Sequence, residues 1–581
     1  MSAVSGKAFD MSLFRRVMGF VRPYMLVFYT SLFLTILLSA LGVIRPVLVG
    51  SIIDKYTTTG DKHGLLMITL VLVGILVLEG IVQFYQTYWT NWLGQSVTID
   101  LRAKLFEHIL SFKLRYFDQT AIGALVTRVI SDIETISEIF AQGLLSIIGD
   151  LLKLVVVIVV MFVVNAQLAL LVLLPVPLLI IATNIFKNAI KHAFQDVRTQ
   201  VSKLNTFVQE HITGMHIVQV FGKERGEQQK FENINKEHRN AHIRSVWAYS
   251  IFFPVVEILS AISLALLVWY GVKNVLNNDV TLGDMVTFIL LIYMMYRPIR
   301  QLADKFNVLQ MGMVGSDRVF KILDTDERIA RTGDLAPQHI NGDITFKDVH
   351  FAYDNKNFVL KDINLEVQRG QSVAFVGATG AGKSSIVNLL SRFYEFDRGE
   401  ITIDGRDIRS YDVDSLRANI AVVLQDVFLF SDTILNNITL NDPNISREKV
   451  IEAAKAIGAH EMIMKFPDGY DHNVRERGGM MSTGQRQLIS FIRAYVTDPS
   501  VLVLDEATSS VDTETEELIQ NAIERLTEGR TSIIIAHRLS TVQKADKIIV
   551  ISKGKILEQG GHFELLEKGG SYKRLFDLQF S

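Results

Sequence analysis

The chain of 581 residues contains no cysteine. Disulfide bonds, thiolate catalysis and zinc sites built from cysteine are therefore excluded. Net charge is also nearly absent, at −2, so no overall basic character favours nucleic acid as a partner. Apolar residues, in contrast, make up 49% of the sequence, which excludes a disordered or collagen-like protein.

The apolar residues are distributed unevenly along the chain. Residues 1–320 contain long apolar runs with charged residues between them, whereas the region from residue 342 onward has glycine turns and short β-branched runs. We expect a membrane domain over residues 1–320, a linker over 321–341 and a soluble α/β domain over 342–581.

Six runs in the first half are apolar enough to predict membrane-spanning helices, since a helix needs about 20 apolar residues to cross the hydrocarbon core. The sixth run is short, but an even number keeps the soluble domain on the side of the basic loops. The predicted spans are Tyr24–Ile44, Leu65–Phe84, Leu144–Val164, Leu168–Phe186, Ser250–Val272 and Met285–Tyr296.

The positions of the cations predict the orientation of these spans. The predicted outer loops hold few cations, among them Lys55, Lys62 and Lys273, whereas the segments after the second and fourth spans are rich in lysine and arginine. Basic loops stay in the cytoplasm, so both termini are expected there, most simply at a bacterial inner membrane. No cleavable signal peptide is predicted, and residues 11–22 suit an amphipathic helix on the membrane surface.

Four ionisable residues fall inside the apolar runs, where a charge is a functional hypothesis by default. Asp150 and Lys153 are three residues apart on one helix, so mutual neutralisation is the favoured interpretation. For Glu79 and Glu257 two interpretations remain open: each lines a polar cavity or lies near an interface.

The soluble half contains a phosphate-binding loop in the required order of strand, loop and helix. The strand-like run Ser372–Val376 precedes Gly377-Ala378-Thr379-Gly380-Ala381-Gly382-Lys383-Ser384, with Ser385 next in the following helix. Glycines let backbone amides surround phosphates at a helix N-terminus. Lys383 is expected to reach the β- and γ-phosphates, and the Ser384 hydroxyl to bind Mg²⁺.

Two further apolar strands end in polar residues suited to phosphoryl transfer. The run Val501–Leu504 is followed by Asp505 and Glu506, which predicts a carboxylate for the Mg²⁺ shell and a second one for the attacking water. The run Ser532–Ala536 ends in His537, where a contact to the γ-phosphate would be useful.

These residues together resemble the ATP-binding cassette (ABC) transporters, and specifically exporter half-transporters whose membrane domain precedes the ATPase domain. The resemblance covers nearly the whole chain. Its deciding motif is Met481-Ser482-Thr483-Gly484-Gln485, which is similar to the family signature LSGGQ and precedes Asp505 in the family's order. The fold class implied is an α-helical six-span transmembrane domain followed by an α/β P-loop NTPase domain.

The resemblance also implies roles, residue by residue. It implies a catalytic base at Glu506, a switch histidine at His537, and Gln425 as a Mg²⁺ sensor that contacts the membrane domain; metal ligation then falls to Ser384, Gln425 and Asp505. Tyr353 resembles the aromatic residue that stacks on adenine, with ordinary strand packing as the alternative. Ser509-Ser510-Val511-Asp512 resembles the loop that couples two ATP sites, and Tyr116-Phe117-Asp118, with Gly123 and Arg128, the first intracellular coupling segment.

The implied function is ATP-driven export, or transfer between leaflets, of amphipathic drugs or lipids by a dimer that binds ATP and Mg²⁺. An ATP-gated channel or a regulatory membrane subunit is the alternative. Thr483 replaces the first glycine of the signature, and Arg475 stands where glycine is usual. Thr483 either caps the signature helix in a working site or marks one half of a heterodimer with a weakened site; homodimer and heterodimer are both left open.

Overall fold

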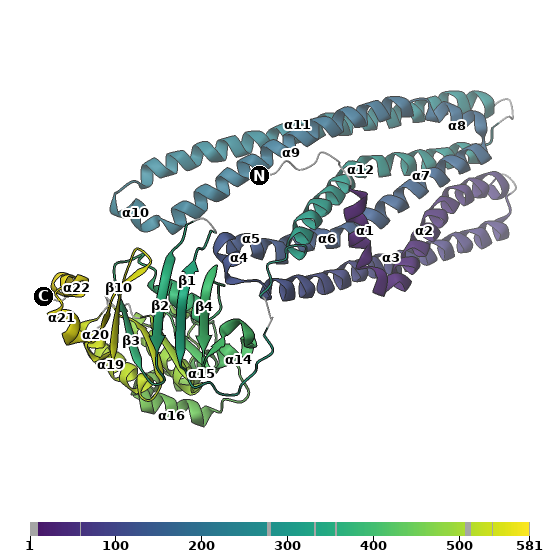
Figure 1. Ribbon diagram of the computed structural model, residues 1–581. Coiled ribbons are helices and arrows are strands. Elements are labelled where there is room, and N and C mark those ends of the chain that lie inside the picture. The colour runs from purple at the N-terminus through teal and green to yellow at the C-terminus, as the bar shows by residue number, and fades with distance from the viewer. Residues whose placement is uncertain are drawn as a thin grey trace. The chain divides into compact units, whose positions relative to one another are not determined.

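The computed structural model describes residues 10–57, 60–275, 280–329, 333–354, 357–505, 513–536 and 538–579. The chain divides into two units, shown in Figure 1. The membrane unit comprises Met1–Leu110 with Ile122–Thr325, and the ATPase unit comprises Ser111–Ala121 with Asp326–Ser581. A short segment of the first half therefore belongs to the second unit.

The described residues of the membrane unit form helices joined by short turns, and none of them belongs to a strand. Its helices are α1 (Met11–Gly19), α2 (Met25–Ser51), α3 (Lys62–Leu110), α5 (Ile122–Thr127), α6 (Ile133–Glu138), α7 (Leu145–Val164), α8 (Ala166–Leu173), α9 (Val176–Thr213), α10 (Met215–Val220), α11 (Glu224–Val275) and α12 (Leu282–Leu323). Single turns of tighter or wider helix at Arg22–Tyr24, Ile52–Thr57, Arg128–Asp132 and Ile139–Leu144 join some of them.

Six helical segments of this unit are long and apolar enough to cross a membrane. They are Arg22–Tyr56, Lys62–Leu110, Ile122–Val164, Ala166–Thr213, Glu224–Val275 and Leu282–Ile299. Each contains one predicted span, so the six-span prediction is confirmed and the protein is an integral multi-pass membrane protein. The short sixth run is the start of the much longer helix α12.

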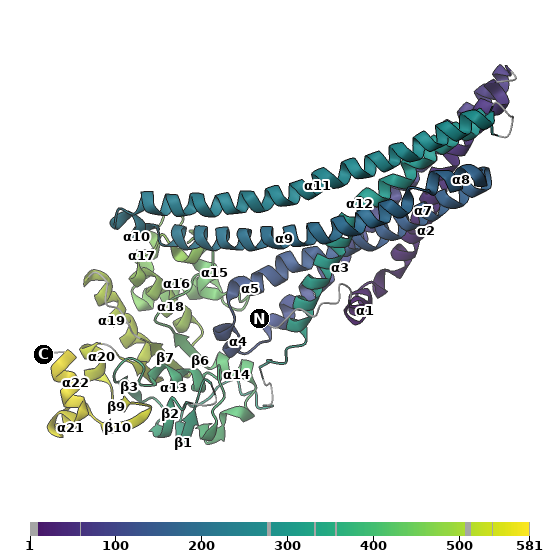
Figure 2. The same cartoon turned by 90° about the horizontal axis from the view of Figure 1, so that it is seen from above.

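Polar caps and small residues position these helices. The Asn165 side chain accepts hydrogen bonds from two amides of α8, which separates the third span from the fourth. The Ser263 hydroxyl donates to the Val172 carbonyl and also hydrogen-bonds the buried Tyr296 hydroxyl, so one polar group joins three helices. Helices α9 and α11 run side by side over much of their length (Figures 1 and 2).

The predicted neutralisation of Asp150 by Lys153 is wrong. Asp150 forms its ion pair with Lys305, which lies on the neighbouring helix α12. Helices α7 and α12 pack together, and this packing brings an ammonium group from a distant part of the sequence into direct contact with the carboxylate. Lys153 is left electrostatically coupled to several charges across a cavity.

The ATPase unit is built on two sheets. Its strands are β1 (Ile344–Phe351), β2 (Leu360–Val367), β3 (Ser372–Val376), β4 (Arg398–Ile403), β5 (Arg406–Asp407), β6 (Ile420–Val423), β7 (Val501–Asp505), β8 (Thr531–Ile535), β9 (Lys547–Ser552) and β10 (Lys555–Gly560). One sheet has the order β2-β1-β4-β5 with antiparallel pairs. The other has the order β10-β9-β3-β8-β7-β6, in which only β10 is antiparallel to its neighbour.

Both faces of the larger sheet are covered, which explains its uninterrupted apolar strands. In β3, Ala374 and Val376 face one apolar core while Val373 and Phe375 face another. The helices of this unit are α4 (Leu114–Gln119), α13 (Lys383–Leu390), α14 (Val413–Ala418), α15 (Ile434–Thr439), α16 (Arg447–Ile457), α17 (His460–Met464), α18 (Thr483–Val496), α19 (Thr513–Thr527), α20 (Leu539–Lys544), α21 (His562–Glu567) and α22 (Ser571–Gln579). A helical membrane unit and an α/β unit confirm the predicted fold class.

Candidate nucleotide site and its coupling segment

The topology of the larger sheet brings the predicted nucleotide residues to one edge. Strands β3, β8, β7 and β6 are parallel neighbours, with Phe375 opposite Ile535, Ile535 opposite Asp505, and Leu504 opposite Val423. Their carboxyl ends therefore lie together, which is where open α/β sheets bind ligands. The loop at Gly377, Asp505 and Gln425 each follow or end one of these strands.

The loop from Gly377 to Gly382 has a backbone that only glycine adopts without strain at three positions. The φ angles are +153° at Gly377, +80° at Gly380 and +110° at Gly382. A Cβ at Gly377 would lie 2.2 Å from the Ile551 carbonyl oxygen, whereas one at Gly380 would meet nothing within 4 Å. The loop is thus tight against β9 on one side and open on the other, as a phosphate group requires.

Lys383 begins helix α13 and is buried, with 7% of its surface exposed. Its ammonium donates hydrogen bonds to the carbonyls of Gly377, at 2.6 Å, and Ala378, at 3.3 Å. Burial lowers the pKa of Lys383, and the nearby Asp505 carboxylate acts in the opposite direction. A negatively charged phosphate beside the ammonium would act in the same direction as Asp505 and favour the protonated form.

The oxygen-bearing residues of this edge suit Mg²⁺, which prefers carboxylate, hydroxyl and carbonyl oxygens. Ser384 and Gln425 are exposed, and Asp505 is half-buried at the end of β7. Among the described residues, no group of three or more histidine or acidic side chains forms a metal cluster. Glu506, Asp512 and His537 lie outside the described residues.

Tyr353 lies just after β1, beside the first turn of α13. Its hydroxyl hydrogen-bonds the Ser385 hydroxyl at 3.0 Å and accepts from the Asn388 amide at 3.0 Å. Its ring meets the rings of Phe351 and Tyr394 edge-on, at 4.6 and 4.9 Å between centroids. Tyr353 therefore packs against the core and also lies near the phosphate loop. Its contact with adenine stays a prediction.

The signature residues form the N-terminus of α18. Ser482 is the cap: its hydroxyl accepts from the Gln485 amide, and the Gln485 side chain accepts from the Ser482 amide. Thr483 is the first helical residue and is exposed; its hydroxyl accepts from Arg486 at 3.3 Å. The interpretation of Thr483 as the cap is therefore wrong, since its neighbour already fills that position. Gly484 and Met481 are buried.

Arg475, shortly before the signature, has φ of +56° and ψ of −166°. This region of backbone space is essentially restricted to glycine. This backbone conformation explains why glycine is usual at the position. With arginine in its place, the turn is strained.

Tyr116, Phe117 and Asp118 of the predicted coupling segment are part of the ATPase unit, whereas Gly123 and Arg128 belong to the membrane unit. Residues 111–113 pair with residues 327–329 through hydrogen bonds from the Lys113 amide to the Glu327 carbonyl, at 2.8 Å, and from the Ile329 amide to the Ser111 carbonyl, at 3.0 Å. The Tyr394 hydroxyl donates to the Asp118 carboxylate at the end of α4. Burial raises the pKa of Tyr394, and Asp118 raises it further, so the phenol stays neutral and remains a donor.

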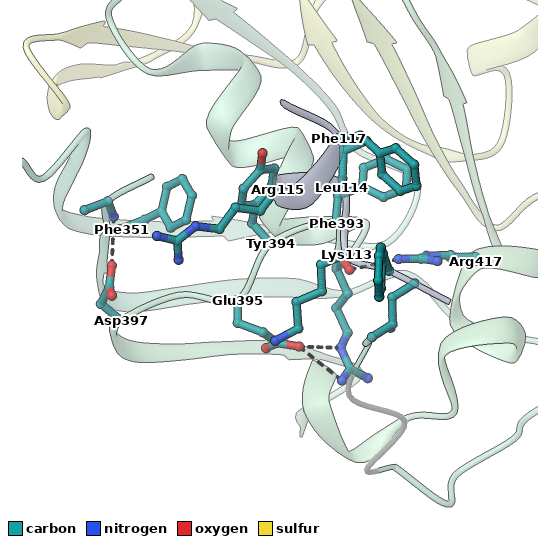
Figure 3. A pocket seen from close by; sticks show the side chains of 14 residues that line it. Lys113, Leu114, Arg115, Phe117, Phe351, Phe393, Tyr394, Glu395, Asp397 and Arg417 are labelled. Carbon is teal, nitrogen blue, oxygen red and sulfur yellow. Dashed lines mark hydrogen bonds and ion pairs between the residues drawn. The ribbon is translucent and has the colours of Figure 1, made fainter. Parts of the chain in front are cut away.

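A cavity of about 260 Å³ lies beside this segment. Its lining includes Leu114, Arg115 and Phe117 of α4 together with Phe393, Tyr394 and Glu395 of the loop after α13 (Figure 3). The loop is held by buried Arg392, whose guanidinium donates to the carbonyls of Ile408, at 3.2 Å, and Tyr411, at 2.9 Å. Sequence reasoning missed Arg392 and Tyr394, because nothing in their local pattern distinguishes them from ordinary core and surface residues.

We expect Tyr394→Phe to weaken the coupling of ATP hydrolysis to transport. The change leaves the Asp118 carboxylate without this donor, and a hydrogen bond to a charged group contributes about 1.5–3 kcal/mol. Transport per ATP hydrolysed in reconstituted vesicles should fall, while basal ATP hydrolysis continues. Tyr411→Phe is the matched control, since its hydroxyl donates to the Ile403 carbonyl within the same unit. Equal losses in both variants would contradict the assignment.

Comparison with known proteins agrees with this architecture. Residues 28–299 match the model of the ABC transporter transmembrane region, and residues 360–509 match the ABC transporter model. The chain is 38% identical to the uncharacterized ABC transporter ATP-binding protein YknV of Bacillus subtilis, covering 99% of this chain and 96% of that protein. It is 35% identical to an ATP-dependent lipid A-core flippase of Syntrophus aciditrophicus, covering 98% and 95% respectively.

A second ATP-dependent lipid A-core flippase, from Thiobacillus denitrificans, is 34% identical over 98% of each chain. Both halves of the sequence, in their order, are therefore accounted for by one group of proteins. The chain belongs to the ABC transporter family: it is an exporter-type half-transporter in which a membrane region and an ATP-binding, ATP-hydrolysing region are fused.

Proposed function

We propose that this chain uses ATP to move amphipathic lipids or drugs across a membrane, or from one leaflet to the other. The observation that carries the proposal is the placement of Ser111–Ala121, which lies between two membrane helices in the sequence but belongs to the ATPase unit. Any movement of the ATPase unit is thus transmitted directly to the chain that continues into α3 and α5. The names of the lipid A-core flippases support a lipid-like substrate.

In the nucleotide site, Lys383 and the amides of Gly377–Ser384 bind the phosphates, and Ser482, Thr483, Gly484 and Gln485 serve the ATP held by a partner. Ser384, Gln425 and Asp505 hold Mg²⁺, which would neutralise charge that develops on the phosphates. Glu506 orients and deprotonates the attacking water, His537 contacts the γ-phosphate, Tyr353 stacks on adenine and Asp512 links the two sites. These roles follow from the resemblance and from the common sheet edge.

The working unit is a dimer, because the resemblance implies that the signature of one chain contacts the ATP bound by the other; the exposure of Ser482 and Thr483 at the start of α18 supports this role. The partner is a second copy or a different half-transporter. The purified chain alone distinguishes these: an active dimer indicates a homodimer, and an inactive monomer indicates a heterodimer. The basic inner loops favour cytoplasmic termini and a bacterial inner membrane.

The proposed function is tested in vesicles that contain the chain with its partner. Fluorescent lipids and cationic dyes are supplied on one side, and ATP-dependent movement is followed by quenching. We expect movement with ATP and none with Glu506→Gln, because that variant keeps the shape of the side chain but loses the base. Glu528→Gln, an exposed acid after α19, is the matched control. Transport that persists in Glu506→Gln would overturn the mechanism, and ATP-dependent ion current without substrate movement would favour the channel, which the relatives do not favour.

A further inference from the structure

The membrane unit contains a polar cavity of about 490 Å³ within the region of its apolar spans. Helices α2, α3, α7 and α12 contribute to it. Its charged lining residues are Arg45, Glu79, Asp150, Lys153 and Arg297, and its remaining lining is largely hydroxyl and amide side chains, such as those of Thr35, Ser39, Gln83, Gln86, Thr87 and Asn91.

The charges in this cavity do not neutralise one another pairwise. Asp150 is paired with Lys305. Within the part of the chain that the structure describes, Arg45, Lys153, Arg297 and Glu79 have no ion-pair partner within 4 Å. Three cations and one anion thus remain in an environment where unpaired charge is costly, and such charges usually mark a ligand path.

The carboxylate of Glu79 has one oxygen without a hydrogen-bond donor among the described residues. Its Oε2 atom is buried and accepts no hydrogen bond from any described residue. Its Oε1 atom lies 3.7 Å from where a Cβ of Gly42 would stand, and the Lys153 ammonium lies 4.0 Å from the same point. Glycine at position 42 therefore leaves room for both charged groups near one another. They attract each other electrostatically without forming an ion pair among the described residues, and the Glu79 Oε2 atom still has no described donor.

The positive and negative side chains of the cavity together indicate which kind of ligand it suits. Lys153 interacts electrostatically with Arg297, Glu79, Asp150 and Arg45, so the cations and the lone carboxylate face a common space. An oxyanion satisfies arginine and lysine donors. A carboxylate with a free acceptor oxygen is satisfied by an N–H donor, and a protonated primary amine supplies both the donor and the charge.

Resting on the proposed transport function, we propose that this cavity binds the headgroup of an amphiphile in which a phosphate is joined to a primary amine. The phosphate contacts Arg45, Lys153 and Arg297, and the ammonium donates to Glu79. Gln86 and Thr87 supply neutral hydrogen bonds at the wall of the cavity. The acyl chains remain in apolar surroundings. Only the headgroup enters the cavity, where contacts with polar side chains replace its contacts with water.

The test compares three phospholipids with identical fluorescent acyl chains in vesicles containing the complete transporter. Phosphatidylethanolamine offers a phosphate and N–H donors, phosphatidylcholine a phosphate and a quaternary amine without N–H, and phosphatidylglycerol a phosphate and hydroxyls. We expect wild type to move phosphatidylethanolamine about tenfold faster than phosphatidylcholine, a ratio equivalent to ~1.4 kcal/mol.

Glu79→Gln should abolish this preference while phosphatidylglycerol movement is retained, because only the ammonium contact is lost. Arg297→Gln should slow all three lipids, because each carries the phosphate. Glu257→Gln is the matched control, since Glu257 is an acid in the fifth span that does not line the cavity. Size-exclusion and thermal-unfolding profiles establish that each variant is folded.

The outcomes separate the inference from the function on which it rests. An unchanged lipid preference in Glu79→Gln, or an equal loss in Glu257→Gln, overturns the headgroup site while ATP-driven transport stands. Unchanged movement of all three phospholipids in Arg297→Gln likewise overturns it, because the phosphate then makes no contact with this cation. No ATP-dependent movement of any substrate by wild type contradicts the proposed function itself.

Discussion

Lys383→Ala should lose most of its affinity for ATP while the fold survives. Lys383 is the cation at the base of the phosphate loop, and a charge-assisted hydrogen bond contributes about 1.5–3 kcal/mol, which corresponds to roughly a 10- to 150-fold rise in Kd. Because burial lowers the pKa of Lys383, removing the ammonium also relieves a desolvation cost. The change in Kd is measured by titrating the protein with a fluorescently labelled ATP and following the fluorescence of the label.

A matched variant makes this result specific. Lys553 lies in the turn between β9 and β10 of the same unit, so Lys553→Ala removes a lysine outside the phosphate loop. It should leave ATP affinity unchanged. Thermal unfolding of both variants should resemble wild type in the absence of nucleotide, whereas ATP should stabilise only wild type and Lys553→Ala. Unaltered affinity in Lys383→Ala would contradict the assignment of the loop.

Asp505→Asn should lower ATP turnover by about 100- to 1,000-fold, the usual effect of removing one preorganised electrostatic contact to the transferring group. Asp505 ends β7 beside Lys383, where its carboxylate can complete the Mg²⁺ shell. Asparagine has the same shape but carries no charge, so β7 and its register should be unaffected. The measurement is steady-state phosphate release at saturating ATP, repeated over a range of Mg²⁺ concentrations.

The dependence on Mg²⁺ distinguishes a lost metal contact from general damage. If Asp505 contacts the metal shell, the Mg²⁺ concentration for half-maximal turnover should rise in Asp505→Asn. Asp498→Asn is the control, since Asp498 lies before the same strand and pairs with Arg530 at the surface. Wild-type turnover and Mg²⁺ dependence in Asp505→Asn would refute the metal role.

The parts of the site that the sequence predicts are those carried by adjacent residues. The octapeptide ending in Ser384 specifies a loop and a helix start, and β7 is readable because it is buried on both faces. Their convergence follows from strand order, which no local pattern contains. That order places Asp505 level with Ile535 and Phe375, and so determines which strand ends share an edge.

The incorrect predictions share a physical cause, which is competition from a partner that the local pattern does not reveal. Asp150 has a lysine one helical turn away, yet a lysine 155 residues further along the chain forms the ion pair. Thr483 has a good capping side chain, but Ser482 has the extended backbone that the cap position requires. The cavity around Glu79 could not be predicted either, because its walls come from four helices whose rotations depend on packing.

The contact between Asp118 and Tyr394 also affects how the protein is made. These residues are 276 positions apart, and a ribosome adding about 5–20 residues per second takes roughly 14–55 s to synthesise the chain between them. Helix α4 leaves the ribosome first, and four further spans are synthesised before its partner loop exists. During this interval the nascent chain carries an aromatic segment with an unfinished binding surface. The membrane helices are therefore synthesised before α4 can pack against the loop around Tyr394, which completes the ATPase unit.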